Sequence, residues 1–164
     1  MKNHLLMDFI VNKEDKSITI RREFAAPLAR VWDAFTKSEI LDQWWAPKPW
    51  KAETKKMDFR EGGTWQYAMR GPEGEVHWAL ANYTKIIPLK SFTGLDAFAD
   101  AEGNINKNMP QSKWDVSFSS SANGTLVSFR ISYEDLAQLE TTIQMGFKEG
   151  ITMAMEGLDQ LLQN

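Results

Sequence analysis

The chain has 164 residues, of which 43% are hydrophobic and 25% are charged, a composition typical of one globular domain. Its net charge of -3 argues against a nucleic-acid-binding protein, because binding to phosphates requires clustered positive charge. The lack of cysteine excludes disulfides, thiolate catalysis and Cys-based metal sites, and the two histidines, His4 and His77, are too far apart in sequence to predict a His-rich metal site.

No segment contains the roughly 20 consecutive apolar residues that a membrane-spanning helix needs, so we expect no membrane span. The apolar run at residues 5–11 is interrupted by Asp8 and has no small-residue cleavage site, which argues against a secretory signal. We therefore expect a cytoplasmic protein. Glycine-rich phosphate motifs and a nucleophile elbow are also absent from the sequence, and we expect no cofactor.

Residues 1–17 are expected to form an N-terminal extension or an edge strand, and residues 18–164 a single domain. Apolar and polar residues alternate over residues 18–24, which predicts a half-buried strand. Apolar residues then recur at helical spacing over residues 28–35, and a second short helix is predicted over residues 38–44.

The segment 65–70 predicts a strand that enters a tight turn at residues 72–73. Such a turn places Tyr67 opposite Trp78 in an antiparallel hairpin. His77 then falls on the outer face, where an ordinary surface histidine is the simpler interpretation. The inner face of this hairpin would carry Trp65, Tyr67, Met69, Val76, Trp78 and Leu80.

A second hairpin is predicted near the end of the sheet. The dipeptide Asn-Gly at residues 123–124 favours a tight type I′ turn. Centred there, the turn places Phe118 opposite Phe129 and Trp114 opposite Tyr133, so that all four rings share one face. Two hairpins with coherent inner faces predict an antiparallel meander.

The remaining segments are less regular. A shift in alternation near Ala81 predicts a β-bulge, and the turn-rich stretch 100–110 predicts a long loop that either forms a cavity rim or is an ordinary connection. One long helix is expected over residues 135–162, with an apolar stripe facing the sheet. Its glycines each cost about 1 kcal/mol relative to alanine, which indicates either that the sheet or another chain approaches closely there or that a ligand takes the space. These glycines are Gly146, Gly150 and Gly157.

Aromatic side chains are the strongest functional signal in the sequence. A curved sheet and a final helix would enclose a cavity, and aromatic walls with a few polar groups suit a small apolar ligand. The simpler alternative is that these rings fill an ordinary core. The candidate ligand-binding residues are Trp65, Tyr67, Met69, Trp78, Trp114, Phe118, Met145 and Phe147.

A series of short motifs runs along the chain in a characteristic order and spacing: REFAAP at 22–27, WWAP at 44–47, FREGGTW at 59–65, MRGPEG at 69–74, FADAEG at 98–103, NGT at 123–125 and MGFKEG at 145–150. Through these motifs the chain resembles the START-like SRPBCC superfamily, and within it the branch of activator of heat-shock-chaperone ATPase homologues (the AHSA-type domain). The resemblance covers about residues 18–162 and implies an α+β helix-grip fold, with a curved antiparallel sheet, two short helices and a long C-terminal helix enclosing a cavity. It transfers no catalytic motif and does not carry over chaperone stimulation.

We expect a domain that binds a small hydrophobic or aromatic ligand without intrinsic catalysis. The first alternative is a cyclase- or aromatase-like enzyme that acts on a polyketide-type substrate. It would use Tyr67 with a carboxylate such as Asp96, and one of these groups must then face the cavity with a shifted pKa. Asp58 and Asp100 are the other carboxylate candidates near strand ends.

The second alternative is a protein-interaction module, for example a chaperone accessory. It would use Trp44, Trp45 and Trp50 as an exposed apolar patch, and it fails if these rings are buried. A homodimer that forms through the sheet edge or the final helix is left open by the sequence.

Overall fold

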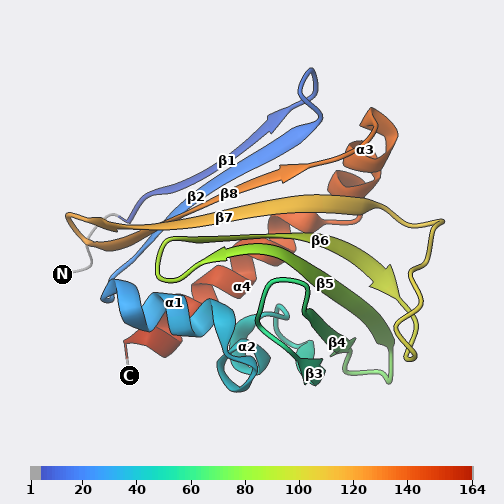
Figure 1. The fold of residues 1–164 in the computed structure, drawn as a ribbon, viewed down its shortest axis with the longest axis horizontal. Helices are drawn as coiled ribbons and strands as arrows, with labels where there is room; N and C mark the ends of the chain where they lie inside the picture. The colour runs from blue at the N-terminus through green and yellow to red at the C-terminus, as the bar shows by residue number, and fades with distance from the viewer. Residues whose placement is uncertain (1–4, 164) are drawn as a thin grey trace.

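The computed structural model describes residues 5–163, which form one eight-stranded antiparallel sheet and four helices (Figure 1). Along the sheet the strands follow the order β1-β2-β8-β7-β6-β5-β4-β3, so β1 and β3 are the two edges. The strands are β1 (Met7–Asn12), β2 (Ser17–Phe24), β3 (Lys51–Met57), β4 (Thr64–Arg70), β5 (Val76–Ile87), β6 (Ser91–Ala99), β7 (Gln111–Ser121) and β8 (Gly124–Ser132). The helices are α1 (Leu28–Thr36), α2 (Ser38–Trp44), α3 (Leu136–Gln144) and α4 (Phe147–Leu162).

The fold class predicted from the sequence is confirmed. Helices α1 and α2 connect β2, beside one edge of the sheet, to β3 at the other edge, and α4 crosses the sheet diagonally (Figure 1). The end of α4 lies against α1, where the Arg30 guanidinium donates hydrogen bonds to the carbonyl oxygens of Leu161 and Leu162. Carbonyl groups in the last turn of a helix lack the amide partner four residues further on, so Arg30 adds hydrogen bonds at the helix end.

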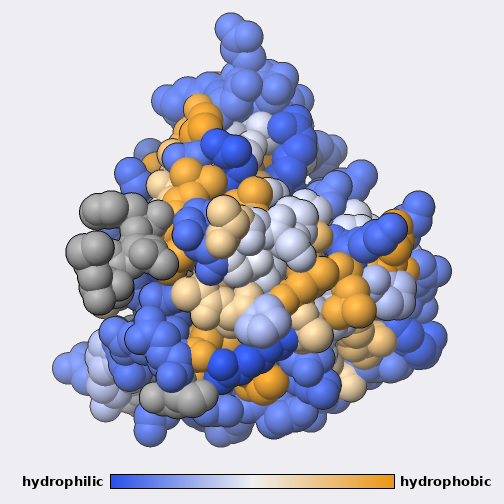
Figure 2. All heavy atoms as spheres, turned by 90° about the vertical axis from the view of Figure 1, so that its left-hand side faces the viewer, coloured by the Kyte–Doolittle hydropathy of each residue, from blue (hydrophilic) through white to orange (hydrophobic). Residues whose placement is uncertain are grey.

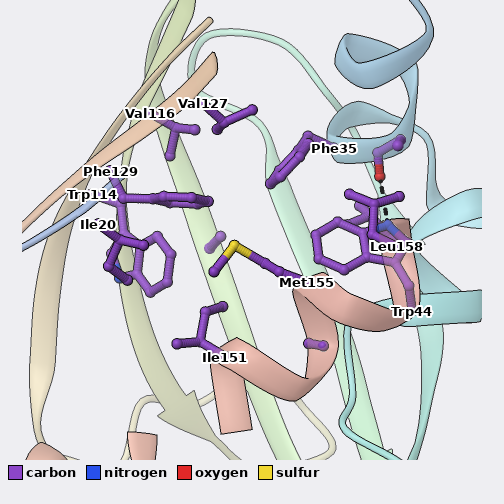
Figure 3. Close-up of a cluster of buried hydrophobic side chains, with 14 of the residues drawn as sticks. Ile20, Phe35, Trp44, Trp114, Val116, Val127, Phe129, Ile151, Met155 and Leu158 are labelled. Atoms are coloured by element: carbon purple, nitrogen blue, oxygen red, sulfur yellow. Dashed lines mark hydrogen bonds between the residues drawn. The ribbon is translucent and has the colours of Figure 1, made fainter. Parts of the chain in front are cut away.

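The core lies between α1, α4 and the middle of the sheet. In Figure 3, Ile151 and Met155 of α4 point toward side chains of β7 and β8, and Leu158 lies on the side of Trp44. The Phe35 ring of α1 joins the two layers, with its centroid 5.4 Å from the ring of Phe118. The sheet side of this cluster consists of Ile20, Trp114, Val116, Val127 and Phe129.

The β4–β5 hairpin differs from the prediction by one residue. Its loop is Pro72 to Gly74, one residue longer than predicted, and Gly74 adopts a φ of 90° that side chains rarely adopt. Tyr67 therefore lies opposite Ala79, and Trp78 lies opposite Ala68. A shift of one residue exchanges the faces of a strand, so the prediction that Trp78 faces inward is wrong.

The β7–β8 hairpin differs from the prediction by two residues in pairing. Its loop is formed by residues 122–123, so that Phe118 lies opposite Val127 and Trp114 lies opposite Ile131. Because side chains alternate with a period of two, this difference changes the partners but keeps every side chain on its predicted face. Trp114 and Phe118 consequently remain on the inner face.

Two further predictions need correction. The irregularity in β5 lies between Tyr83 and Lys85 and not near Ala81. The predicted helix over residues 135–162 is interrupted by Gly146, whose φ of 87° lies outside the helical region, and is divided into α3 and α4. The break changes the direction of the chain beside the sheet.

The glycines of α4 are not explained by close contact with the sheet. A Cβ atom at Gly150 would lie 3.8 Å from Pro47 Cγ, an ordinary contact, and one at Gly157 would have no atom within 4 Å. The expectation that the sheet approaches closely at these positions is therefore wrong. Of the two, Gly150 lines a cavity.

None of the helices in residues 5–163 is long and apolar enough to cross a membrane. Figure 2 shows the face that lies at the left of Figure 1, where apolar residues gather toward the middle and hydrophilic residues surround them. A mostly apolar cavity lies elsewhere, between the sheet and the helices α3 and α4.

Candidate functional site: a cavity between the sheet and the final helices

A cavity of about 250 Å³ is enclosed by strands β4 to β7 on one side and by α3 and α4 on the other, and it is partly open to solvent. Its surface is mostly apolar. The segment after α2 closes one end with Trp45 and Pro47, and α4 contributes Phe147, Gly150 and Ile151. The break at Gly146 allows residues of both α3 and α4 to reach the same cavity.

Two tryptophans and a phenylalanine form half of the aromatic wall, and Tyr67, Phe98 and Tyr133 form the other half. The ring of Trp114 lies 6.0 Å from that of Trp45 and 6.1 Å from that of Phe147, measured between centroids. The rings meet at angles of 54° and 83°, the tilted and edge-on arrangements that aromatic pairs prefer. The three side chains come from three different elements, so the wall depends on the tertiary fold.

The hydroxyl of Tyr67 is the best-positioned polar group in the cavity. Its ring stacks on Trp65 with 4.0 Å between centroids, and its oxygen accepts a hydrogen bond of 3.0 Å from Trp45 Nε1. Trp65 is held in turn by a hydrogen bond of 3.0 Å from its Nε1 to Thr54 Oγ1. Burial raises the pKa of Tyr67 well above its ordinary value. The hydroxyl therefore keeps its proton at neutral pH and is a donor to a ligand.

Asp96 of β6 is the only charged residue that lines the cavity among the residues the structure describes. It lies at an inward position of the strand, whereas the neighbouring Leu95 points outward and is 50% exposed. Desolvation by burial raises the pKa of its carboxyl to about 7. Within residues 5–163, no group forms a hydrogen bond or an ion pair with this carboxylate.

Three tyrosines lie close enough to Asp96 for its negative charge to raise their pKa values. Burial is the larger cause of the raised pKa in each of them. They come from different parts of the sheet: Tyr67 from β4, Tyr83 from β5 and Tyr133 from the segment after β8. At neutral pH all three are uncharged, so none of them adds a second negative charge beside Asp96. Among residues 5–163, no cationic side chain lines the cavity.

Four of the eight candidate binding residues line the cavity: Tyr67, Met69, Trp114 and Phe147. Trp65 lines a smaller neighbouring cavity of about 30 Å³, which shares Trp45, Asp96 and Trp114 with the main one. The other three candidates lie elsewhere. They are Trp78, Phe118 and Met145.

Each of these three positions has a physical explanation. Trp78 is on the outer face because of the longer β4–β5 loop, and the ammonium of Lys55 lies 5.7 Å from its ring centroid. Phe118 faces inward but packs deeper, 5.0 Å from the ring of Trp32. Met145 is 49% exposed, because it ends α3 just before the break at Gly146.

The predicted patch of three exposed tryptophans does not exist in the structure. Trp44 is 2% exposed, and its Nε1 donates a hydrogen bond of 3.0 Å to the carbonyl oxygen of Ala34, the dashed line in Figure 3. Trp45 lines the cavity, and Trp50 stacks on His77 with 5.5 Å between centroids. The exposed patch on which the interaction module depended is therefore not formed by these three tryptophans.

The remaining candidates are structural or outside the cavity. His77 was predicted to lie on the outer face, but it lies opposite Met69 and shares the face of that residue. It is nevertheless exposed and does not line the cavity. Asp58 pairs with Arg60 at the surface, and Asp100 accepts hydrogen bonds within its own loop. Among residues 5–163, no group of three or more histidine or carboxylate side chains could hold a metal ion.

Sequence reasoning missed several contributors to the cavity, among them Trp45 and Ser112. Trp45 was assigned to the surface, and Ser112 was not named as a lining residue. Ser112 could have been found from strand parity, because it is two residues from Trp114. No local pattern identifies Trp45, since its position depends on how α2 packs against β3.

Solved structures of similar proteins support this description of the fold. Protein Ms6760 from Mycobacterium smegmatis is 31% identical, the alignment covers 97% of both chains, and the TM-score is 0.89. A protein from Arthrobacter aurescens is 28% identical over 95% of this chain and 91% of that chain, with a TM-score of 0.89. A protein from Staphylococcus epidermidis is 25% identical over 93% of both chains, with a TM-score of 0.82. No curated protein matches the chain.

The family comparison agrees with the resemblance seen in the sequence motifs. The family model described as Activator of Hsp90 ATPase homolog 1-like protein matches residues 25–163, which include every residue that lines the cavity. The architecture is that of the START-like helix-grip fold. The chain therefore belongs to the Activator of Hsp90 ATPase homolog 1-like family.

Proposed function

We propose that the protein binds a small hydrophobic or aromatic ligand in the cavity between the sheet and α3–α4, without catalysing a reaction. The observation that carries this proposal is a mostly apolar cavity in which only a few polar groups converge. This combination is characteristic of small-molecule sites, where the apolar wall supplies affinity and the polar groups set orientation.

The volume of the cavity limits the size of the ligand. At about 250 Å³ it lies just below the range of about 300–1,000 Å³ that is usual for small-molecule pockets. A ligand of one or two fused rings suits this volume better than a long acyl chain. The flat rings of Trp45 and Trp114 favour the same shape, because they offer surfaces for stacking.

The two glycines of α4 provide a matched test. A Gly150→Leu side chain would project toward the cavity beside Pro47, whereas a Gly157→Leu side chain would enter open space. Both substitutions replace a helical glycine by a good helix former, so both variants should fold. We expect Gly150→Leu to weaken binding of a bicyclic aromatic probe at least tenfold and Gly157→Leu to leave it unchanged.

Binding is measured by isothermal titration calorimetry with a panel of aromatic and lipid probes, and folding by circular dichroism. The proposal is wrong if the unmodified protein shows saturable binding to none of the probes. It is also wrong if Gly150→Leu and Gly157→Leu weaken binding equally, because the site would then lie outside the cavity.

A second candidate function is supported by Asp96 and Tyr67. An enzyme of the cyclase or aromatase kind requires an acid–base group that titrates near neutral pH and a hydrogen-bond donor for a carbonyl oxygen. Asp96, with a pKa of about 7, and the protonated hydroxyl of Tyr67 meet these requirements and line the same cavity. Short aromatic-forming polyketone probes test this function: turnover that Asp96→Asn and Tyr67→Phe both abolish would favour the enzyme, and lack of turnover would leave the binding function alone.

A further inference from the structure

We propose that the ligand is a compact ring compound with a single protonated amine, which binds with its nitrogen at Asp96 between the rings of Trp45, Tyr67 and Trp114. This inference rests on the proposed function, because it names the class of ligand that the cavity accepts. The geometry that supports it is a lone carboxylate placed in an aromatic wall.

The first argument concerns hydrogen-bond partners. The Asp96 carboxylate lines both cavities and has no hydrogen-bond or ion-pair partner in residues 5–163. A half-buried carboxylate without a partner is unfavourable, because it has lost water and gained nothing in exchange. A ligand ammonium would supply a charge-assisted hydrogen bond, which is stronger than a bond between neutral groups.

The second argument concerns the rings around the carboxylate. Trp45 and Trp114 line the same two cavities as Asp96, and Tyr67 is joined to Trp45 by a hydrogen bond of 3.0 Å. The faces of tryptophan and tyrosine rings attract cations, and this attraction strengthens when the site is partly shielded from water. A cation at Asp96 therefore gains from the aromatic wall as well as from the carboxylate.

The third argument concerns charge selection. The ionisable groups that face Asp96 are Tyr67 from β4, Tyr83 from β5 and Tyr133 after β8, and their raised pKa values keep them neutral. Among residues 5–163, no lysine, arginine or histidine lines the cavity. An anionic ligand such as a fatty acid would therefore meet a carboxylate and no compensating cation. The site selects cations and disfavours anions.

The pH dependence of affinity provides a signature of this pairing. A carboxyl with a pKa of about 7 is mostly protonated at pH 5, and it must lose its proton before it can pair with an ammonium. Affinity for an amine should therefore rise with pH, by roughly 50- to 100-fold between pH 5 and pH 8, if only the ionised carboxylate binds the amine tightly. A neutral ligand of the same shape has no reason to follow this rise.

The test compares three bicyclic probes that differ in charge: 1-naphthylmethylamine, 1-naphthylmethanol and 1-naphthoate. Affinities are measured by isothermal titration calorimetry at pH 5 and pH 8 with the full chain. At pH 8 we expect the amine to bind at least tenfold more tightly than the alcohol, and the carboxylate probe to bind more weakly than either. The preference for the amine over the alcohol should fall at pH 5.

Two variants with the same change in charge complete the test. Asp96→Asn keeps the shape of the side chain and should remove the preference for the amine while preserving affinity for the alcohol. Asp115→Asn alters an exposed position on the outer face of β7 and should leave the preference unchanged. If Asp96→Asn does not fold, the pH dependence of the unmodified protein gives the same information.

The outcomes separate this inference from the proposed function. If the alcohol binds and the amine binds no more tightly at pH 8, the inference is overturned while the proposed function stands. Survival of the amine preference in Asp96→Asn also overturns the inference. If none of the probes binds, either in this set or in the wider panel, the proposed function fails and the inference fails with it.

Discussion

For Asp96, the sequence predicts the orientation of the side chain, whereas its burial against the cavity becomes clear only from the fold. Alternation along β6 places Phe92, Gly94, Asp96 and Phe98 on one face, so an inward carboxylate could be anticipated from the pattern alone. Position near a strand end does not by itself distinguish Asp96 from Asp58 or Asp100. The distinction is desolvation, because only Asp96 of the three lies against the apolar cavity.

Buried Asp96 should make stability depend on pH in a definite direction. The folded protein retains this proton up to a pH of about 7, whereas the unfolded chain releases it near pH 3.8, so the free energy of unfolding falls as pH rises between these values. Asp96→Asn removes this dependence. The quantity to compare is the free energy of unfolding of the variant minus that of the unmodified protein. We expect this difference to be about 1–3 kcal/mol larger at pH 8 than at pH 5.

Urea unfolding at the two pH values measures this difference, with Asp115→Asn as the control. Asp115 is exposed on the outer face of the sheet, so its replacement should change stability equally at both pH values. An Asp96→Asn effect of the same size at pH 5 and pH 8 would contradict the assignment of a raised carboxyl pKa.

At the scale of elements, the two hairpins explain why some predictions held. The β7–β8 loop moved the pairing by two residues and kept the inner face, whereas the β4–β5 loop moved it by one and reversed β5. Residue patterns located every strand of these hairpins. The number of residues in a loop is harder to predict, because Gly71, Pro72 and Gly74 are all compatible with several turns.

The break between α3 and α4 can be tested with glycine substitutions. Gly146→Ala should destabilise the fold by about 1–2 kcal/mol, because a Cβ is unfavourable at a φ of 87°. Gly157→Ala should stabilise it by about 0.5–1 kcal/mol, because this glycine lies within the regular helix α4 and a Cβ would meet no other atom. Thermal and urea unfolding check the opposite signs, and stabilisation by Gly146→Ala would show that the chain does not need the break.

At the scale of the whole molecule, composition predicted an aromatic interior but did not distinguish a packed core from a cavity wall. The ring of Phe118 packs against those of Trp32 and Phe35, at 5.0 Å and 5.4 Å between centroids. Those of Trp45, Trp114 and Phe147 surround the cavity. The difference arises from the packing of α1 and α4 on the sheet, which involves contacts between distant segments that local patterns do not specify.

The two kinds of aromatic residue should respond differently to truncation. Phe35→Ala removes a ring that is 4% exposed and touches four others, so we expect a loss of about 3–5 kcal/mol of stability. Phe147→Ala removes a half-buried ring at the cavity and should cost about 1–2 kcal/mol. Equal losses in urea unfolding would mean that the cavity wall is packed as tightly as the core.

The two edge strands of the sheet, β1 and β3, differ in their ability to pair with a strand from another copy of the protein. Along β3, the Thr54 amide already donates a hydrogen bond of 3.0 Å to Asp42 of α2, and the strand is interrupted between Thr54 and Lys56. A strand from another molecule would not find a regular ladder there. Along β1, Ile10 and Val11 are 53% and 37% exposed on a regular strand without a second neighbour in residues 5–163. The β1 edge is therefore better suited than β3 to pairing with a strand from another molecule, and two copies joined through β1 would form a closed pair with a β3 edge at each end.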